Sequence, residues 1–223
     1  MIVAERKPFD EILSMIGNAR KVLILGCGSC VTVCMAGGEK ETQLLASTIR
    51  LSDKKQNITR ELRCATIERQ CDKEFFAAVA NDVKWADIIV SMACGVGVQF
   101  CGEVFTDKEV VPALNTKFYG ATVEQGVWSE RCVGCGDCVL FKFGGICPIA
   151  RCSKSLLNGP CGGSQNGMCE VDPENIQCGW QLIYDRMAAI GRLDLLEQNQ
   201  PLKNWSTGRD GGPRRVVKED ATL

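Results

Sequence analysis

The spacing of apolar residues divides the chain into two parts of different character. In the first part, apolar residues at three- and four-residue intervals predict a helix over residues 8–19. Continuous apolar runs at 21–25 and 87–91 are typical of strands buried in a parallel sheet. Further helices are expected over 37–51 and 72–81, strands over 58–67 and 110–114, and a polar connection over 52–57. This alternation predicts a Rossmann-like, doubly wound α/β domain over residues 1–126.

The periodic pattern ends near residue 126, and cysteine and glycine dominate the rest of the chain. A small, loop-rich, cysteine-rich metal-cluster domain is expected over 127–198, because too few apolar residues remain to form a core without metal. Asp172-Pro173-Glu174 predicts the start of a C-terminal helix, with aspartate as the cap and proline in the first turn. Residues 199–223 combine proline, glycine and mixed charges, which predicts a tail that is disordered or ordered only on docking.

Composition narrows the chemistry. The 223-residue chain has fifteen cysteines, no histidine and a net charge of −1. The near-neutral charge argues against a nucleic-acid surface. The start of the chain has no targeting pattern and no run is long enough to span a membrane, so a cytoplasmic protein is expected. In a reducing compartment clustered cysteines indicate metal ligands, and without histidine a metal must be held mainly by thiolates.

The strongest motif is Cys132-x2-Cys135-x2-Cys138, the opening of the bacterial ferredoxin pattern. The Cys-Pro pair that usually follows lies further along the chain, at Cys147-Pro148. The remaining cysteines of this part are Cys152, Cys161, Cys169 and Cys178. Eight cysteines suffice for two four-cysteine sites. The predicted partition groups the opening triplet with Cys178 and places the other four together, because the remote ligand of such a triplet often belongs to the other cluster.

A second group of cysteines follows the predicted strands of the first part: Cys27, Cys30, Cys34, Cys71 and Cys94. The carboxyl ends of parallel strands share one edge of the sheet, where ligands bind, so these side chains are expected to converge on a third cluster. Five ligands are one too many, and the sequence does not indicate which is spare. Cys64 and Cys101 are interpreted as small buried hydrophobic residues instead.

Two alternatives concern the nature of these sites. Four-cysteine zinc sites would also suit the second part, although a triplet with two-residue spacing is less usual for zinc than a pair of doublets. Gly26-Cys-Gly28 after a strand suggests a dinucleotide fingerprint, but valine stands at position 31 where the third glycine would be. Iron–sulfur clusters are therefore the favoured interpretation, with three [4Fe-4S] clusters expected and zinc left open for the C-terminal part.

Several longer motifs together resemble one family. They are Leu25-Gly-Cys-Gly-Ser-Cys30, Gly37-Gly-Glu-Lys40, Glu68-Arg-Gln-Cys71, Ala93-Cys-Gly-Val-Gly-Val98, Arg131-Cys-Val-Gly-Cys-Gly-Asp-Cys138, Gly144-Gly-Ile-Cys-Pro-Ile-Ala-Arg-Cys152, Leu156-Leu-Asn-Gly-Pro-Cys-Gly-Gly-Ser-Gln-Asn-Gly167 and Trp180-Gln-Leu-Ile-Tyr-Asp185. This set resembles the MetV family, the small subunit of the two-subunit methylenetetrahydrofolate reductases of acetogenic bacteria. The resemblance covers nearly the whole chain except about the last twenty residues.

The resemblance implies a function that composition cannot show. It implies an electron-transfer and stabilising subunit that works with a MetF-like flavoprotein, which carries the flavin and reduces methylenetetrahydrofolate in the acetyl-CoA (Wood–Ljungdahl) pathway. A further electron-donor subunit or a ferredoxin is left open as a second partner. The alternative is a structural zinc-binding scaffold with no electron-transfer role. A free-standing oxidoreductase is disfavoured, because the chain has no histidine and no evident pair of catalytic carboxylates.

Overall fold

The computed structural model describes residues 1–218, so the last five residues of the predicted tail lie outside the described part. The chain divides into two compact units, one over Met1–Trp128 and one from Ser129 onward. Within residues 1–218, no helix combines the length and the apolar character that crossing a membrane requires.

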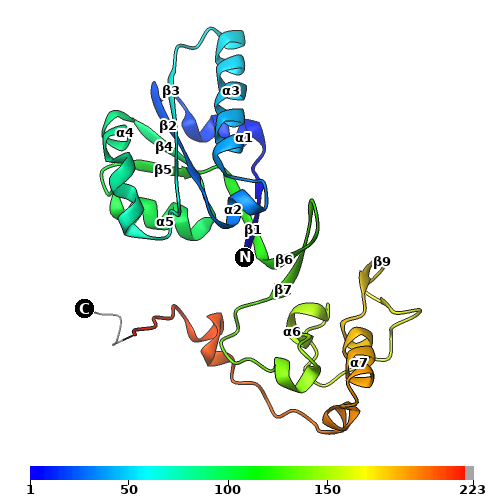
Figure 1. Ribbon diagram of the computed structural model, residues 1–223. Helices are drawn as coiled ribbons and strands as arrows, with labels where there is room; N and C mark the ends of the chain where they lie inside the picture. Colours follow the sequence, from blue (N-terminus) through cyan, green and yellow to red (C-terminus); the bar gives the residue numbers. More distant parts are fainter. Residues whose placement is uncertain (219–223) are drawn as a thin grey trace. The chain divides into compact units, whose positions relative to one another are not determined.

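The first unit is built on a four-stranded parallel sheet (Figure 1). Its strand order is β3 (Glu61–Ile67), β2 (Lys21–Cys27), β4 (Ile88–Met92) and β5 (Glu109–Pro112). The middle strands are the continuously apolar runs of the sequence, and every residue of β4 is buried. This arrangement confirms the predicted α/β fold.

Helices cover both faces of this sheet. They are α1 (Phe9–Ile16), α2 (Cys30–Val33), α3 (Glu39–Gln56), the 3-10 helix η1 (Lys73–Val79), α4 (Ala80–Trp85) and α5 (Gly95–Val104). Alternate residues of β2 point to opposite sides: Ile24 packs with the core residues of α1 and α3, and Leu25 packs with those of η1, α4 and α5. Two apolar cores therefore hold the sheet between its helices.

Two predicted boundaries in this unit are wrong. The polar stretch at 52–57 belongs almost entirely to α3, where Lys54 and Lys55 lie in the last turn and interact favourably with the helix dipole. Asp53 is buried there, and its carboxylate pairs with Arg60 at 2.6 Å. The helix predicted over 72–81 is instead η1 followed by α4.

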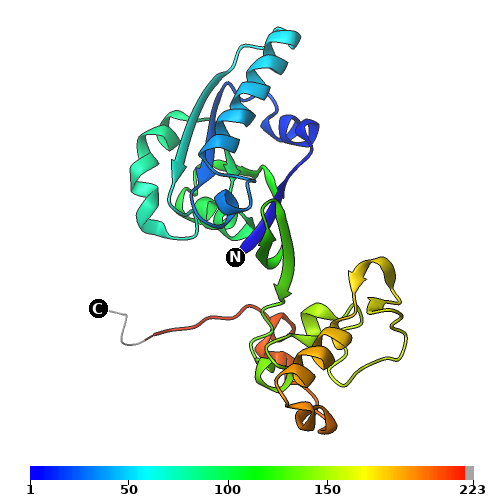
Figure 2. The same ribbon diagram turned by 45° about the vertical axis from the view of Figure 1, so that its right-hand side comes forward.

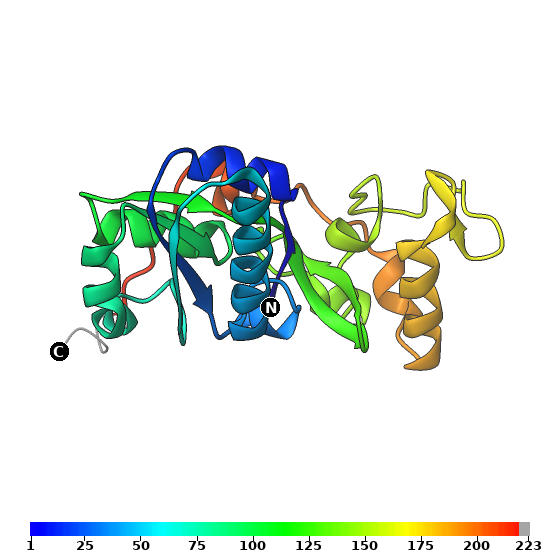
Figure 3. The same cartoon turned by 90° about the horizontal axis from the view of Figure 1, so that it is seen from above.

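A second sheet was not predicted. Its strands are β1 (Ile2–Arg6), β6 (Leu114–Glu124) and β7 (Val127–Cys132), in the order β1-β6-β7. β1 pairs antiparallel with β6, and Figure 3 shows the two strands side by side. These strands escape detection in the sequence because β6 is mostly exposed and carries polar residues on both faces.

The second unit consists of short elements joined by loops around α7 (Gly179–Ala189), drawn in orange in Figure 2. The others are η2 (Leu140–Phe143), α6 (Pro148–Arg151), β8 (Met168–Cys169), β9 (Asp172–Gln177), η3 (Leu193–Glu197), η4 (Trp205–Thr207) and η5 (Arg209–Gly211). A small apolar core contains Phe143, Trp180, Ile183 and Met187. The rings of Phe143 and Trp180 meet edge to face, with centroids 5.5 Å apart.

The predicted start of the C-terminal helix is wrong. Asp172 does accept hydrogen bonds from the backbone N–H groups of Glu174 and Asn175, as a cap would. The chain after it is extended, however, because it pairs with β8 as strand β9, and the helix begins only at Gly179. A side-chain cap of this kind also forms in turns outside helices.

Candidate functional site

The parallel sheet brings three strand ends to one edge in the first unit. Strand β2 ends at Cys27, the loop after β3 leads to Cys71, and the loop after β4 contains Cys94. This edge is closed by short hydrogen bonds: the Gly28 N–H donates to the Ile67 carbonyl at 2.8 Å, and the Ser29 hydroxyl donates to the Glu68 carbonyl at 2.8 Å. The topology therefore places these cysteines as the sequence predicts.

Cys27 lies at the centre of this edge. Burial raises the pKa of the Cys27 thiol, backbone N–H groups of Ser29 and Gln70 lower it in part, and the neighbouring thiols of Cys94 and Cys71 raise it further. If these neighbouring thiols were deprotonated together, their negative charges would repel one another. A bound metal ion or cluster would reduce that repulsion. Cys30, at the start of α2, is partly exposed and influences the ionisation of Cys34.

Cys34 differs from the other four cysteines of this group. Its Sγ lies 3.7 Å from the Ala4 carbonyl oxygen of β1 and 3.7 Å from the Val31 carbonyl oxygen. The side chain is buried in the core beneath β1, and burial raises the pKa of its thiol, with a further contribution from the nearby Cys30. These contacts with backbone carbonyls distinguish Cys34 from the other four cysteines.

Gln70 is a buried residue that the sequence analysis did not single out. Its side chain is 0% exposed. Its Nε2 donates to the Leu25 carbonyl at 2.8 Å and the Gly26 carbonyl at 3.1 Å, and its Oε1 accepts from the Ser91 hydroxyl at 2.7 Å. A polar side chain among the strand ends therefore ties β2 to β4 directly beneath the cysteines. No periodic pattern marks it, since it lies in a loop.

Cys64 and Cys101 occupy different environments. Cys101 is 0% exposed on α5 and packs in the apolar core, as a small hydrophobic residue would. Cys64 was expected to be buried, but it is exposed on the edge strand β3. The expectation failed because β3 has only one neighbouring strand and most of its residues are partly or fully exposed.

Cys101 is expected to resist alkylation in the folded chain. Burial raises the pKa of its thiol to about 12, so it stays protonated, and its stabilising contribution is present below about pH 9 and lost as the pH rises toward 12. Iodoacetamide treatment at about pH 8.5, read by mass spectrometry, should leave Cys101 unmodified until urea is added. Exposed Cys64 is the control. Equal rates at the two positions would contradict the buried placement.

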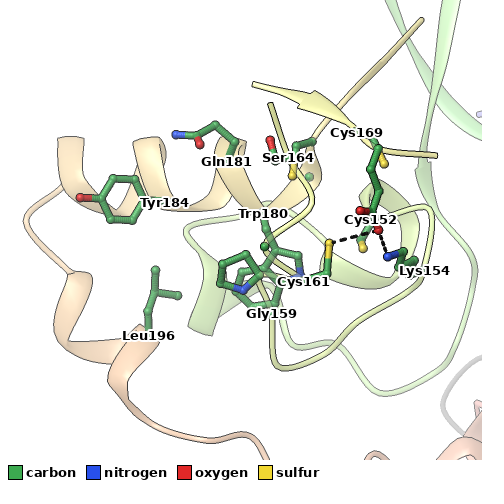
Figure 4. A pocket seen from close by; sticks show the side chains of 15 residues that line it. Cys152, Lys154, Gly159, Cys161, Ser164, Cys169, Trp180, Gln181, Tyr184 and Leu196 are labelled. Atoms are coloured by element: carbon green, nitrogen blue, oxygen red, sulfur yellow. Dashed lines mark hydrogen bonds and ion pairs between the residues drawn. The ribbon is translucent and has the colours of Figure 1, made fainter. Parts of the chain in front are cut away.

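In the second unit, four cysteines line one cavity of about 390 Å³: Cys152, Cys161, Cys169 and Cys178. They come from the end of α6, a glycine-rich loop, strand β8 and the residue before α7. Figure 4 shows three of these side chains, those of Cys152, Cys161 and Cys169, together with Trp180, which also lines the cavity. Segments separated by up to about 26 residues therefore meet at one site.

Charged and polar groups surround this cavity. Lys154 and Glu170 form an ion pair, and Cys161 Sγ lies 3.8 Å from Glu170 Oε1 (Figure 4). A hydrogen bond with the Ser153 hydroxyl, at 3.4 Å, lowers the pKa of Cys169 below its usual range, and backbone N–H groups and Lys154 contribute. A thiol with a lowered pKa is a better ligand, because the thiolate is the form that binds metal.

The loop between Cys132 and Cys138 contains the remaining triplet. Its backbone turns through Gly134 and Gly136, whose φ angles of 64° and 81° favour glycine. The Gly134 N–H donates to Cys132 Sγ at 3.3 Å. Cys147 directly precedes α6, with Pro148 in its first turn. Cys147 does not line the four-cysteine cavity, whereas Cys178 does.

The types of side chain present fit a metal bound by thiolates. In the described residues, however, these side chains are not arranged around one point. Among residues 1–218, no three Cys, Asp or Glu side chains lie close enough to hold a single ion. All the grouped donors are sulfurs, which suit iron–sulfur clusters and zinc and do not suit hard cations. Metal binding at each set of cysteines therefore stays a prediction.

Residues 111–206 match the family model described as methylene-tetrahydrofolate reductase C terminal. The matched segment is less than half of the chain, and it contains all eight cysteines of the second unit. No curated protein matches the chain. No solved structure matches it either. The second unit is thus similar to a segment of methylenetetrahydrofolate reductases.

Proposed function

We propose that this chain is an iron–sulfur subunit of a methylenetetrahydrofolate reductase complex and passes electrons to a flavin-containing catalytic partner. The observation that carries the proposal is the cavity lined by four cysteines, because it lies within the segment similar to the reductase family. An all-thiol site without histidine suits storage and transfer of electrons better than acid–base catalysis.

The placement of the cysteines supports a proposed division into three sets of ligands. The proposed set of the first unit is Cys27, Cys30, Cys71 and Cys94, with Cys34 as the spare residue because its Sγ lies against the Ala4 carbonyl. Cys152, Cys161, Cys169 and Cys178 form the cavity set. Cys132, Cys135, Cys138 and Cys147 then remain as the loop set. This partition exchanges Cys147 and Cys178 relative to the one expected from the sequence.

The protein residues would give these sites their electron-transfer properties. When bound, a [4Fe-4S] cluster supplies one-electron chemistry that no side chain of this protein offers. The hydrogen bond from Ser153 lowers the pKa of the Cys169 thiol and so favours the thiolate that binds metal. The Lys154 ammonium places positive charge near the cavity. Flavin and folate would bind to the partner, which is proposed to be a MetF-like flavoprotein.

Removing a cavity cysteine tests the proposal. Protein freshly purified without oxygen should contain about twelve iron atoms per chain and an equal amount of inorganic sulfide. The Cys161→Ser variant should contain about eight of each. Cys64→Ser is the matched control, because Cys64 lies outside all three sets, and it should keep the full content. Iron and sulfide analysis with visible absorption provides the measurement.

The same preparation separates electron transfer from a scaffold role. The reduced chain should bleach the flavin absorbance of its co-purified partner, and Cys161→Ser should do so more slowly. If the protein is colourless and contains zinc but no iron or sulfide, the proposal is overturned. The alternative of a structural zinc-binding scaffold would then hold.

A further inference from the structure

The C-terminal residues 203–214 fold back onto the Cys132–Cys138 loop. Arg214 Nη1 donates to the Gly134 carbonyl at 2.8 Å and to the Thr207 carbonyl at 3.1 Å, so it joins the loop to the segment that holds it. Thr207 Oγ1 lies 3.0 Å from the Cys135 carbonyl oxygen. These contacts order the described residues of this region against a loop of the same chain.

A buried lysine anchors the start of the same segment. The side chain of Lys203 is 1% exposed, and its Nζ lies 3.2 Å from Asp137 Oδ2 and donates to the Asp137 carbonyl. The ammonium is also 5.8 Å from the ring centroid of Trp205. Burying a charged amine is costly unless it is paired, so this arrangement indicates a specific attachment to the loop.

The packing between the two segments leaves no room for a side chain. Gly136 has a φ of 81°, and a Cβ at this position would overlap the Thr207 carbonyl oxygen. On the other side, a Cβ at Gly208 would lie 3.2 Å from the Cys135 carbonyl oxygen. Three carbonyls of the loop, those of Gly134, Cys135 and Asp137, thus face donors from the C-terminal segment.

We propose that residues 203–214 act as a clamp that fixes the Cys132–Cys138 loop in a ligand-ready conformation, with Lys203 and Arg214 as its positioning residues. The function of the clamp in the assembled protein rests on the proposed metal binding, whereas the clamp itself is a property of the metal-free chain. Most of it lies beyond residue 206, where the family match ends.

The physical reason is the flexibility of the loop. Two glycines in left-handed conformations and a stretch without regular structure lose much conformational entropy on ordering. Hydrogen bonds from the C-terminal segment to the loop carbonyls order the loop before metal binds. Metal binding then loses less conformational entropy.

Thiol reactivity in the reduced, metal-free full chain tests the clamp. Cys135 is partly buried, so its alkylation by iodoacetamide reports opening of the loop. Arg214→Gln is expected to raise the Cys135 rate about fivefold, since a hydrogen bond to a charged donor is lost. Lys203→Met should act in the same direction. The exposed Cys161, in the other set, provides an internal reference in each sample.

Matched controls make the result decisive. Arg215→Gln removes the same charge one residue later, where the side chain is exposed and has no hydrogen-bond partner among residues 1–218. It should leave the Cys135 rate unchanged. Equal rates in Arg214→Gln, Arg215→Gln and the unsubstituted chain would overturn the clamp. Gly136→Ala supplies a second route to the open loop, with far-UV circular dichroism as the check on folding.

A chelator experiment then separates the clamp from metal binding. If the loop set holds iron, Arg214→Gln should release about four irons to a chelator severalfold faster than Arg215→Gln. A chain that contains no iron but still shows the alkylation difference would retain the clamp and reject the proposed cluster. Iron release at equal rates, with equal alkylation rates, would reject the clamp alone.

Discussion

Replacing Gly37 with alanine is expected to destabilise the first unit by at least about 3 kcal/mol. A Cβ at this position would overlap the carbonyl oxygen of Met92, the last residue of the buried strand β4. The backbone of Gly37 is also engaged: its carbonyl accepts from the Cys27 N–H at 2.9 Å. Relief of the overlap must therefore move the end of β2 or of β4, and with it Cys27 or Cys94.

Urea unfolding followed by far-UV circular dichroism measures this effect on the full chain. Gly102→Ala is the matched control, because nothing lies within 4 Å of a Cβ there among the described residues and the position is inside α5. Alanine is the better helix former, so this control should be neutral or more stable by up to about 1 kcal/mol. Similar midpoints for the two variants would show that the backbone at Gly37 has more room than the structure gives it.

The parallel sheet could be predicted because its signal is local. Strands β2 and β4 are continuous apolar runs, and the helices between them show apolar residues at helical spacing. The antiparallel sheet has no such signal: β1 has only five residues, and its partner β6 is mostly exposed. Pairing between segments more than a hundred residues apart stabilises these strands, and periodicity within each segment does not reveal it.

In the candidate sites too, some features follow from the local sequence and others depend on long-range packing. Convergence of Cys27, Cys71 and Cys94 follows from a topological rule about parallel strands, so the sequence suffices to predict it. The contact of Cys34 with the Ala4 carbonyl depends on how the four-residue helix α2 turns beneath β1. That orientation is set by packing, which spacing along the chain does not encode.

The second unit was harder to predict for a related reason. Loops determine which cysteines meet there, and the cavity is lined by Cys178, the residue before α7, and not by Cys147. The C-terminal segment was predicted from its composition alone, which is polar and rich in glycine. Hydrogen bonds to a distant loop order its described part, and composition does not report such contacts.

Gln70→Leu is expected to destabilise the first unit by about 3 kcal/mol, since buried polar groups left without partners cost about 1–3 kcal/mol each. Leucine has nearly the right size, but it cannot donate to the carbonyls of Leu25 and Gly26 or accept from Ser91. Urea unfolding of the full chain gives the loss. Gln99→Leu, at an exposed position of α5, is the control and should change the free energy of unfolding little.

A double substitution shows whether the network, rather than the volume of the side chain, causes the loss. Ser91→Ala removes the hydroxyl donor that loses its acceptor in Gln70→Leu, so the double variant should be more stable than the sum of the two single losses predicts. Strict additivity would mean that the hydrogen bond between Gln70 and Ser91 contributes nothing to stability. A favourable coupling would establish that the ends of β2 and β4 are tied through Gln70 and Ser91. Any metal site at this edge would then rest on a buried polar support that contains none of its ligands.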